Sequence, residues 1–231
     1  MRICVISDLH ANLEALSALP QNYDELWVLG DLVNYGPDPA ATIDFVRSHA
    51  SLVIRGNHDH SVGFAADCGC SPRFLTMAEA TRDYTIATLS AADKQYLRQL
   101  PTSAQREIQG TIFFLCHATP ANLLYEYRPP DSPLWDQTEE ASKGANIILA
   151  GHTHLQFSRR SGERVIVNPG SLGQSKAGDP LARYAVWENG YFELKAREYP
   201  VETTAKKITA MPIADNVKRD LIQVLRTGTM P

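Results

Sequence analysis

The sequence predicts an α/β fold for its 231 residues. First, short runs rich in Val, Ile and Leu are apolar at both parities, as in strands that are covered on both faces. Second, segments of helical periodicity separate these runs. Third, histidine, aspartate or asparagine follows several strand ends, where an open α/β sheet collects its ligands. One domain with helical additions fits this length.

Three strands are expected near the N-terminus, at residues 2–6, 26–29 and 52–54. A polar side chain suited to ligand binding follows each of them directly. In chain order, these side chains are Asp8 with His10, Asp31, and Asn57 with His58. Because the carboxyl ends of parallel strands meet at one edge of a sheet, these residues are expected to converge.

Helical patterns fill the spaces between these strands. Asn12 can cap a short helix that ends at Leu19 before Pro20, and a second helix follows Pro39 and ends near Ser48. Residues 62–101 predict a helical flank of two helices. The first begins at Ser71-Pro72, and the second at Ser90 with a capping box in which Asp93 replaces the usual Glu.

The second half predicts further strands with the same kind of ending. A hairpin at 107–115 leads into His117, and the run 146–150 leads into Gly151-His152-Thr153-His154. A helix is expected from Ser132-Pro133 to about Lys143. Strands are also expected at 155–159 and 164–167, with a hairpin at 183–195 and tail helices near 206–211 and 214–225.

Composition narrows the class of function. The net charge of −4 and the pI of about 6.0 give no basic footprint, which argues against long nucleic acid and anionic membranes as partners. No apolar run approaches the ~18 residues of a membrane helix, and the N-terminal run is too short for a signal peptide, so a cytoplasmic protein is expected. Cys4 and Cys116 lie in strand-like runs and are expected to be reduced core residues.

The remaining cysteines, Cys68 and Cys70, are separated by one residue rather than the two usual in zinc pairs. No second pair of cysteines accompanies them in the sequence. A structural role is therefore the expectation for both.

The strand-end residues have the chemistry of a metal site. Asp, Asn and His without thiolate suit Mn, Fe, Co, Ni or Zn, whereas several histidines argue against Ca or Mg. Seven ligands are too many for one catalytic ion that keeps positions open, so two ions that share one carboxylate fit better. If residues 152–154 stay extended, the Cα atoms of His152 and His154 lie roughly 6.5–7 Å apart on one side, which suits a pair of ions.

These motifs in this order resemble the calcineurin-like metallophosphoesterase superfamily. The resemblance is carried by Asp8-Leu9-His10, Gly30-Asp31, Gly56-Asn57-His58-Asp59, His117 and Gly151-His152-Thr153-His154. Asn168-Pro169-Gly170-Ser171 and the size further resemble its small YfcE-like phosphodiesterase branch. The resemblance implies a four-layer αββα sandwich of two mixed sheets. Residues 1–200 would form this domain, and 201–231 a helical tail docked on it.

The resemblance also implies a role for each strand-end residue. One metal would be held by Asp8, His10, Asp31 and His154, and the other by Asp31, Asn57, His117 and His152. Asp31 would bridge the two ions, which would lower the pKa of a shared water for in-line attack on phosphorus. His58 would donate a proton or a hydrogen bond to the leaving oxygen.

One departure from the family bears on the substrate. Where the protein phosphatase branch has an Asp that orients the catalytic His and an Arg that clamps phosphate, this sequence has Asn34 and Tyr35. Arg55 is a candidate substitute, because Arg binds phosphate with two parallel hydrogen bonds, but a structural ion pair is an equal alternative. Arg55 and Asn34 are therefore the candidate substrate-binding residues.

The resulting expectation is a phosphodiesterase with two divalent ions, of which Mn is preferred and Fe, Zn, Co or Ni are alternatives. Its substrate would be a small phosphodiester or a nucleotide. The alternatives are a phosphomonoesterase of a small metabolite and a non-catalytic scaffold with the same fold. A nuclease is disfavoured because the acidic balance lacks a basic stripe for long nucleic acid.

Overall fold

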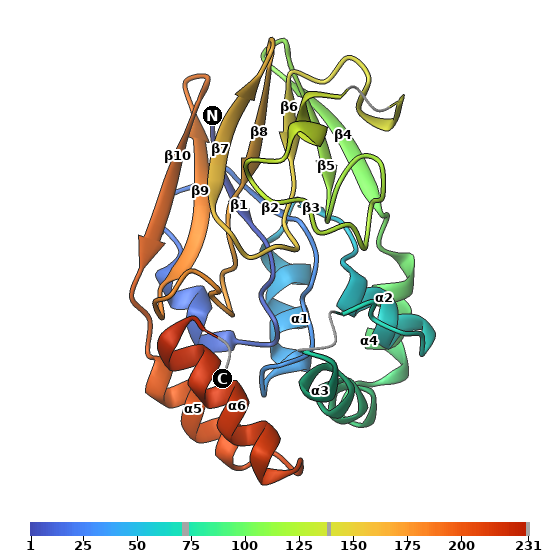
Figure 1. The fold of residues 1–231 in the computed structure, drawn as a ribbon, viewed down its shortest axis with the longest axis vertical. Coiled ribbons are helices and arrows are strands. Elements are labelled where there is room, and N and C mark those ends of the chain that lie inside the picture. The colour runs from blue at the N-terminus through green and yellow to red at the C-terminus, as the bar shows by residue number, and fades with distance from the viewer. Residues whose placement is uncertain (71–73, 138–139, 230–231) are drawn as a thin grey trace.

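The computed structural model describes residues 1–70, 74–137 and 140–229. Two five-stranded mixed sheets pack face to face, with strand orders β10-β9-β1-β2-β3 and β4-β5-β6-β8-β7 (Figure 1). Helices gather at one end of the pair of sheets. The predicted α/β sandwich of two mixed sheets flanked by helices is confirmed.

The first sheet is built around the N-terminal strand. β1 (Arg2–Ile6) pairs in parallel with β2 (Glu25–Val28), and β2 pairs in parallel with β3 (Leu52–Val53). On its other edge β1 pairs antiparallel with β9 (Ala182–Glu188), which forms a hairpin with β10 (Tyr191–Arg197). The two ends of the domain therefore meet in one sheet.

The second sheet has a parallel centre and antiparallel edges. β5 (Thr111–Cys116), β6 (Ile147–Leu149) and β8 (Arg164–Asn168) are parallel. β4 (Ser103–Ile108) and β7 (Phe157–Ser161) close the two edges as hairpin partners. The carboxyl ends of the parallel strands in both sheets carry the polar residues predicted from the sequence.

Aromatic rings fill the space between the sheets. Phe113 of β5 meets Trp27 of β2 edge to face at 5.2 Å between ring centroids, and Trp187 of β9 at 5.4 Å. All three are almost fully buried. This apolar interior fixes one sheet against the other, and with it the loops at the strand ends.

Helices cover the outer face of the first sheet. The short 3-10 helix Leu13–Ala18 precedes α1 (Pro39–His49). α1 packs its buried Ile43 and Val46 into the apolar core between the first sheet and the helices. α2 (Asn57–Phe64), α3 (Leu75–Thr88) and α4 (Ala91–Gln99) form the flank. The helical flank was predicted to begin at residue 62. Instead α2 begins at Asn57, because the Asp59 carboxylate accepts the backbone N–H of Gly56 and caps the first turn at 2.9 Å. The predicted cap at Ser71-Pro72 lies outside the described residues.

The outer face of the second sheet has a thinner cover. In place of the predicted helix from 133 to 143, the described residues form two short 3-10 turns, Pro133–Asp136 and Glu140–Ser142. Trp135 packs its ring against Ile148 and Ile166, and its Nε1–H donates to the Pro129 carbonyl at 2.9 Å. This anchored tryptophan holds the segment in a turn rather than in a helix.

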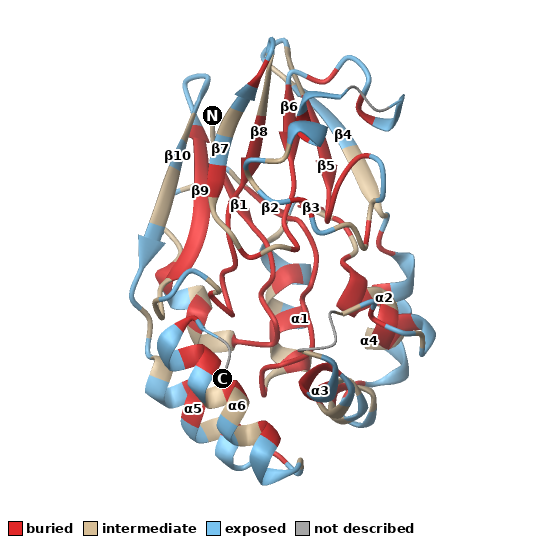
Figure 2. Cartoon of the chain, in the orientation of Figure 1, coloured by how far each residue is buried: buried red, intermediate tan, exposed pale blue. Residues whose placement is uncertain are grey.

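The C-terminal helices α5 (Val201–Thr209) and α6 (Asp215–Thr227) pack against each other and against α3. Their buried and exposed residues alternate with helical period, as Figure 2 shows. Thr204 donates to Asn12 Oδ1 at 2.9 Å, and Lys207 pairs with Asp38 at 2.8 Å. α5 starts and ends earlier than the helix predicted near 206–211, whereas α6 starts and ends slightly later than the helix predicted near 214–225. The division of the chain at residue 200 remains a prediction.

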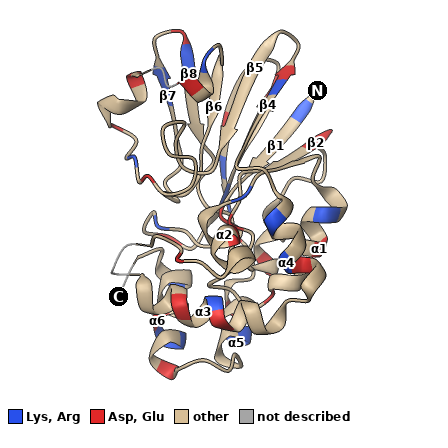
Figure 3. Ribbon diagram, turned by 90° about the vertical axis from the view of Figure 1, so that its right-hand side faces the viewer, with Lys and Arg blue, Asp and Glu red and all other residues tan. Residues whose placement is uncertain are grey.

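Among the described residues, no helix is both long and apolar enough to span a bilayer. Lys and Arg are interspersed with Asp and Glu over the face shown in Figure 3.

Candidate metal centre

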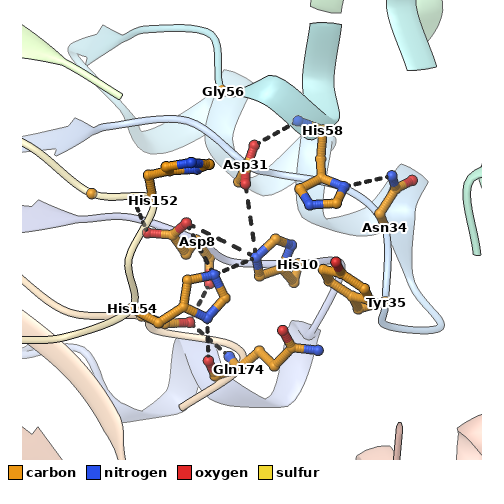
Figure 4. Close-up of polar contacts among 12 residues, drawn as sticks. Asp8, His10, Asp31, Asn34, Tyr35, Gly56, His58, His152, His154 and Gln174 are labelled. Carbon is orange, nitrogen blue, oxygen red and sulfur yellow. Dashed lines mark hydrogen bonds and ion pairs between the residues drawn. The ribbon is translucent and has the colours of Figure 1, made fainter. Parts of the chain in front are cut away.

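The strand-end residues converge where the two sheets meet. Asp8 and His10 follow β1, Asp31 follows β2, and Asn57 opens α2 after β3. From the second sheet, His117 follows β5, and His152 and His154 follow β6. Each of these residues is at most 2% exposed. Figure 4 shows the central part of this arrangement.

One group of donor atoms comprises Asp8, His10 and His154. His154 Nε2 lies 3.3 Å from Asp8 Oδ1, and His10 Nε2 lies 3.1 Å from His154 Nε2. His10 Nε2 also lies 3.9 Å from Asp31 Oδ2. Asp31, which belongs to the second group of donor atoms, therefore also lies beside this first group.

The other group comprises Asp31, His117 and His152. His117 Nε2 lies 3.3 Å from Asp31 Oδ2 and 2.9 Å from Asn57 Oδ1. His152 Nδ1 lies 3.1 Å from the same amide oxygen. Asp31 thus has a histidine of each group within 4 Å of its Oδ2.

Backbone carbonyls fix the orientation of three of these histidines. Their Nδ1–H groups face carbonyl oxygens at 3.2 Å for His10 and Val33, 2.7 Å for His117 and Leu29, and 2.6 Å for His154 and Gln174. With the proton on Nδ1, each ring points its Nε2 atom towards the centre, where this atom can bind a metal ion. This arrangement is usual for metal-ligating histidines.

A cation fits this donor set. The Nε2 atoms of His10 and His154 face each other at 3.1 Å with both ring protons on the opposite nitrogens, so two lone pairs point at one another. Asp8 Oδ1 and His152 Nε2 are buried and have no hydrogen-bond partner among the described residues. Unpaired buried acceptors are costly unless a cation or a proton lies between them.

The backbone that presents the ligands is strained. Asp8, His10, Asp31, His152 and His154 all have φ between 49° and 64°, the left-handed region that residues with a Cβ avoid. Each such conformation costs on the order of 1–3 kcal/mol and is retained where the surroundings impose it. The condition of an extended segment at 152–154, on which the expected Cα spacing of His152 and His154 rested, is therefore not met. The two histidines diverge because of a left-handed turn.

Charges within the site act on each pKa. Burial opposes ionisation of Asp8 and Asp31, yet His154 and His117 respectively hold each carboxyl pKa below its usual value. Burial lowers the pKa of His152 to about 3 and that of His10 well below its usual value. These two imidazoles are therefore neutral near pH 7, which is the form that binds metal.

His58 lies beside the two groups. Its Nδ1 lies 2.9 Å from Asn34 Nδ2, and its backbone N–H donates to Asp31 Oδ1 at 2.9 Å. Burial lowers the pKa of His58 to about 4. Asn34 thus contacts and orients His58. In the protein phosphatase branch named above, an aspartate has this position.

Arg55 points to other partners. Its guanidinium donates to the carbonyl of Arg98 at 2.8 Å and lies over the Phe64 ring at 5.1 Å. These contacts favour a structural role for Arg55, although neither of them is the ion pair that was the expected alternative. Its role as a phosphate clamp remains a prediction.

Two residues near the centre were missed by the sequence analysis. Lys176 lies with Nζ 4.3 Å from the Phe74 ring centroid, and its charge contributes to lowering the pKa of His58 and His154. Tyr127, 45% exposed, lies with its ring centroid 4.0 Å from that of His152. The one sequence signal for Lys176 was its position shortly after Asn168-Pro169-Gly170-Ser171. In the structure Ser171 Oγ donates to the Asp8 carbonyl at 2.8 Å, and this contact leads the following loop, with Lys176, back to the site.

Comparison with known proteins gives the same picture over most of the chain. Residues 1–189 match the family model of the calcineurin-like phosphoesterase superfamily domain. The crystal structure of a metallophosphoesterase from Sphaerobacter thermophilus superposes with a TM-score of 0.81 at 28% identity, covering 97% of this chain and 98% of that one.

Two relatives match by sequence at lower identity. An uncharacterized protein of Methanocaldococcus jannaschii is 26% identical over 229 residues, which cover 89% of this chain and 91% of the relative. Phosphodiesterase YfcE of Escherichia coli K12 is 24% identical over 207 residues, which cover 82% of this chain and 88% of YfcE.

Proposed function

Because this chain belongs to the calcineurin-like phosphoesterase superfamily and is a hydrolase of phosphoric esters, we propose that it is a phosphodiesterase of small phosphodiesters or nucleotides that uses two divalent metal ions. Its similarity to YfcE supports the small phosphodiesterase branch. Mn is the first choice of metal for a set of Asp, Asn and His ligands, with Fe, Zn, Co or Ni as alternatives.

One observation carries this proposal. Two groups of donor atoms lie on either side of Asp31, and in one of them two imidazole lone pairs face each other at 3.1 Å. Asp8, His10 and His154 would hold one ion, and Asn57, His117 and His152 the other, with Asp31 between them. When bound, such a pair of ions supplies an activated water and neutralises the phosphoryl oxygens.

The other residues would bind and orient the substrate. Lys176 would pair with a phosphoryl oxygen, and one lysine matches the single negative charge of a diester. His58 would hold a proton at Nε2 and donate it to the leaving oxygen, while the Asn34 amide donates to its Nδ1 at 2.9 Å. Tyr127 would cover the side of His152 and contact the leaving group.

The test is hydrolysis of bis-p-nitrophenyl phosphate by the Mn-loaded full chain, with metal content measured on the same sample. We expect turnover that Asp31→Asn and His117→Ala reduce by at least about 100-fold, as for the loss of a group that acts on the transition state. His49→Ala, at an exposed position on α1, is the matched control. If protein with two bound ions hydrolyses neither diesters, monoesters nor nucleotides, the proposal is wrong. Preference for monoesters would overturn the assignment of a diester.

A further inference from the structure

A third group of donor atoms lies next to the metal centre. The sulfurs of Cys68 and Cys70 and a ring nitrogen of His58 lie within 4.8 Å of one another. Cys70 Sγ is 3.5 Å from His58 Nε2, the nitrogen that faces away from Asn34. In the structure the two sulfurs are bonded to each other as a disulfide.

We propose that, once this disulfide is reduced, Cys68, Cys70 and His58 bind one thiophilic divalent ion such as Zn²⁺ or Cd²⁺. The ion would bind to His58 Nε2, so that this nitrogen could no longer carry and donate a proton. The site is inferred from these three side chains alone, whereas the block of catalysis also rests on the proposed function.

The loop that carries the sulfurs is held in place. Gly69 has φ +64°, and a Cβ at this position would meet the Tyr125 ring at 2.7 Å. Its N–H donates to Asp67 Oδ1 at 2.9 Å. Asn57 Nδ2 donates to the Cys68 carbonyl at 2.7 Å, so the loop is tied directly to α2. Both cysteines are thereby presented on the same side as His58 before any ion arrives.

Burial favours capture of an ion at this place. Cys68 is 3% and His58 4% exposed, whereas Cys70 is only partly buried and gives access from solvent. The Tyr35 hydroxyl lies 3.8 Å from Cys70 Sγ, within the sulfur hydrogen-bond range, and can donate to a thiolate there. Two thiolates and one imidazole leave a fourth tetrahedral position for water.

Asn34 can form a hydrogen bond with either neutral tautomer of the His58 ring. When Asn34 Nδ2 donates to Nδ1, the ring proton is on Nε2, which is the proton donor's form. Asn34 Oδ1 is buried and has no hydrogen-bond partner among the described residues. If the amide turns over, Oδ1 accepts a proton on Nδ1 and Nε2 becomes free to bind metal. An aspartate at this position could only accept.

The chemistry separates this site from the other two groups. Thiolates select thiophilic ions, whereas Asp, Asn and His without sulfur suit Mn.

Reduction of the disulfide consumes two electrons and two protons, supplied by a dithiol reductant that is itself oxidised to a disulfide. Binding of the ion then releases the two thiol protons. The reduced chain can thus bind the ion at this site, whereas the oxidised chain cannot.

The experiment is a Cd²⁺ titration of the Mn-loaded full chain after reduction with a phosphine. The disulfide oxidises the phosphine to its oxide, and one water supplies the oxide oxygen and the two thiol protons. We expect one equivalent of Cd²⁺ to produce the ultraviolet sulfur-to-cadmium charge-transfer band. The oxidised chain should give no band. Cys68→Ser and Cys70→Ser should each weaken Cd²⁺ affinity at least 10-fold, while Cys4→Ser, in the buried strand β1, should leave it unchanged.

Four outcomes would overturn parts of the inference. A reduced chain without the band, or a Cys70→Ser variant that binds Cd²⁺ as tightly as the wild type, excludes the site. Unchanged affinity in His58→Ala removes His58 from it. If the band forms but hydrolysis continues, the ion site stands and the role of His58 in catalysis fails. Expected instead is loss of most activity with one equivalent of Cd²⁺ in the reduced chain only.

Discussion

The Asp59 carboxylate accepts the backbone N–H of Asp31 at 2.8 Å. The same carboxylate accepts the N–H groups of Leu32 at 2.8 Å and Gly56 at 2.9 Å. Asp59 is fully buried, and it therefore holds together the strand-end turn at Asp31 and the start of α2, which lie directly against each other beside the metal centre.

Asp59→Ala leaves three buried N–H groups without an acceptor. At about 1 kcal/mol or more for each, the free energy of unfolding should fall by at least ~3 kcal/mol. Urea unfolding of metal-free protein measures this change. Asp44→Ala, at an exposed position on α1, should change the same quantity by less than ~0.5 kcal/mol. Equal stability of the two variants would refute this role of Asp59.

Gly56→Ala should disable metal binding although Gly56 supplies no ligand. A Cβ at this position would overlap with Oδ1 of Asp31 and with its backbone nitrogen, so the proposed bridging carboxylate must move. We expect the variant to lose at least one of two Mn ions in elemental analysis and most of its diesterase activity. Gly110→Ala is the control: a Cβ there meets no atom within 4 Å, so the positive φ of +78° should cost stability without loss of metal. Full metal content in Gly56→Ala would contradict the prediction.

His152 and His154 should serve different ions. His154 lies against Asp8, and His152 against Asn57. His154→Ala should therefore weaken one site of a two-site Mn titration, and His152→Ala the other, each leaving close to one tightly bound ion. Simultaneous and equal loss of both ions in either variant would count against the division.

The stability of the metal-free protein should depend on pH through His117. Burial opposes its protonation, but the charge of Asp31 and their hydrogen bond raise the pKa of His117 to about 9. In the unfolded chain this pKa is about 6.5, so the native state binds more protons between these values. The contribution is complete below pH ~6.5 and is lost as the pH rises through about 9.

Denaturant unfolding of metal-free wild type and His117→Gln from pH 6 to 10 measures this contribution. The difference in unfolding free energy between the two should shrink as the pH rises. A difference that stays constant across this range would show that His117 does not carry the extra proton.

Lys176 and Arg55 can be separated by kinetics. Lys176→Met should lower kcat/KM for a diester by about 10- to 100-fold, corresponding to a hydrogen bond to a charged group of ~1.5–3 kcal/mol. Arg55→Met should lower it by less, since the Arg55 guanidinium is bonded to the Arg98 carbonyl. Lys206→Met, on the exposed side of α5, controls for charge. A larger loss in Arg55→Met would make Arg55 the phosphate clamp.

Much of the fold was predictable because its signals are local. The apolar runs gave the strands, and residues directly after them lie at the strand ends in the structure. The helix predicted at 133–143 is wrong because Trp135 is anchored on the second sheet through Pro129, a contact that periodicity does not encode. The start of α2 was missed although its cap is local, with Asp59 three residues after Gly56, because Gly56-Asn57-His58-Asp59 was interpreted as a strand end that carries ligands.

The site was only partly predictable for a similar reason. Its strand-end residues are specified by motifs, but Lys176 belongs to no motif and reaches the centre through the fold. Cys68 and Cys70 were expected to be structural, because spacing along the chain says nothing of their approach to His58 in space. The left-handed backbone at His152 likewise depends on tertiary contacts.

The pairing of β1 with β9 also has a consequence for synthesis on the ribosome. Ile3, Cys4 and Val5 pair with Trp187, Val186 and Ala185, which are translated well after His154 has completed the proposed ligand set. A nascent chain that stops before residue 182 would contain every proposed ligand and still expose an unpaired, apolar strand edge, a template for aggregation. Chains truncated before residue 182 should therefore aggregate although they contain every proposed ligand.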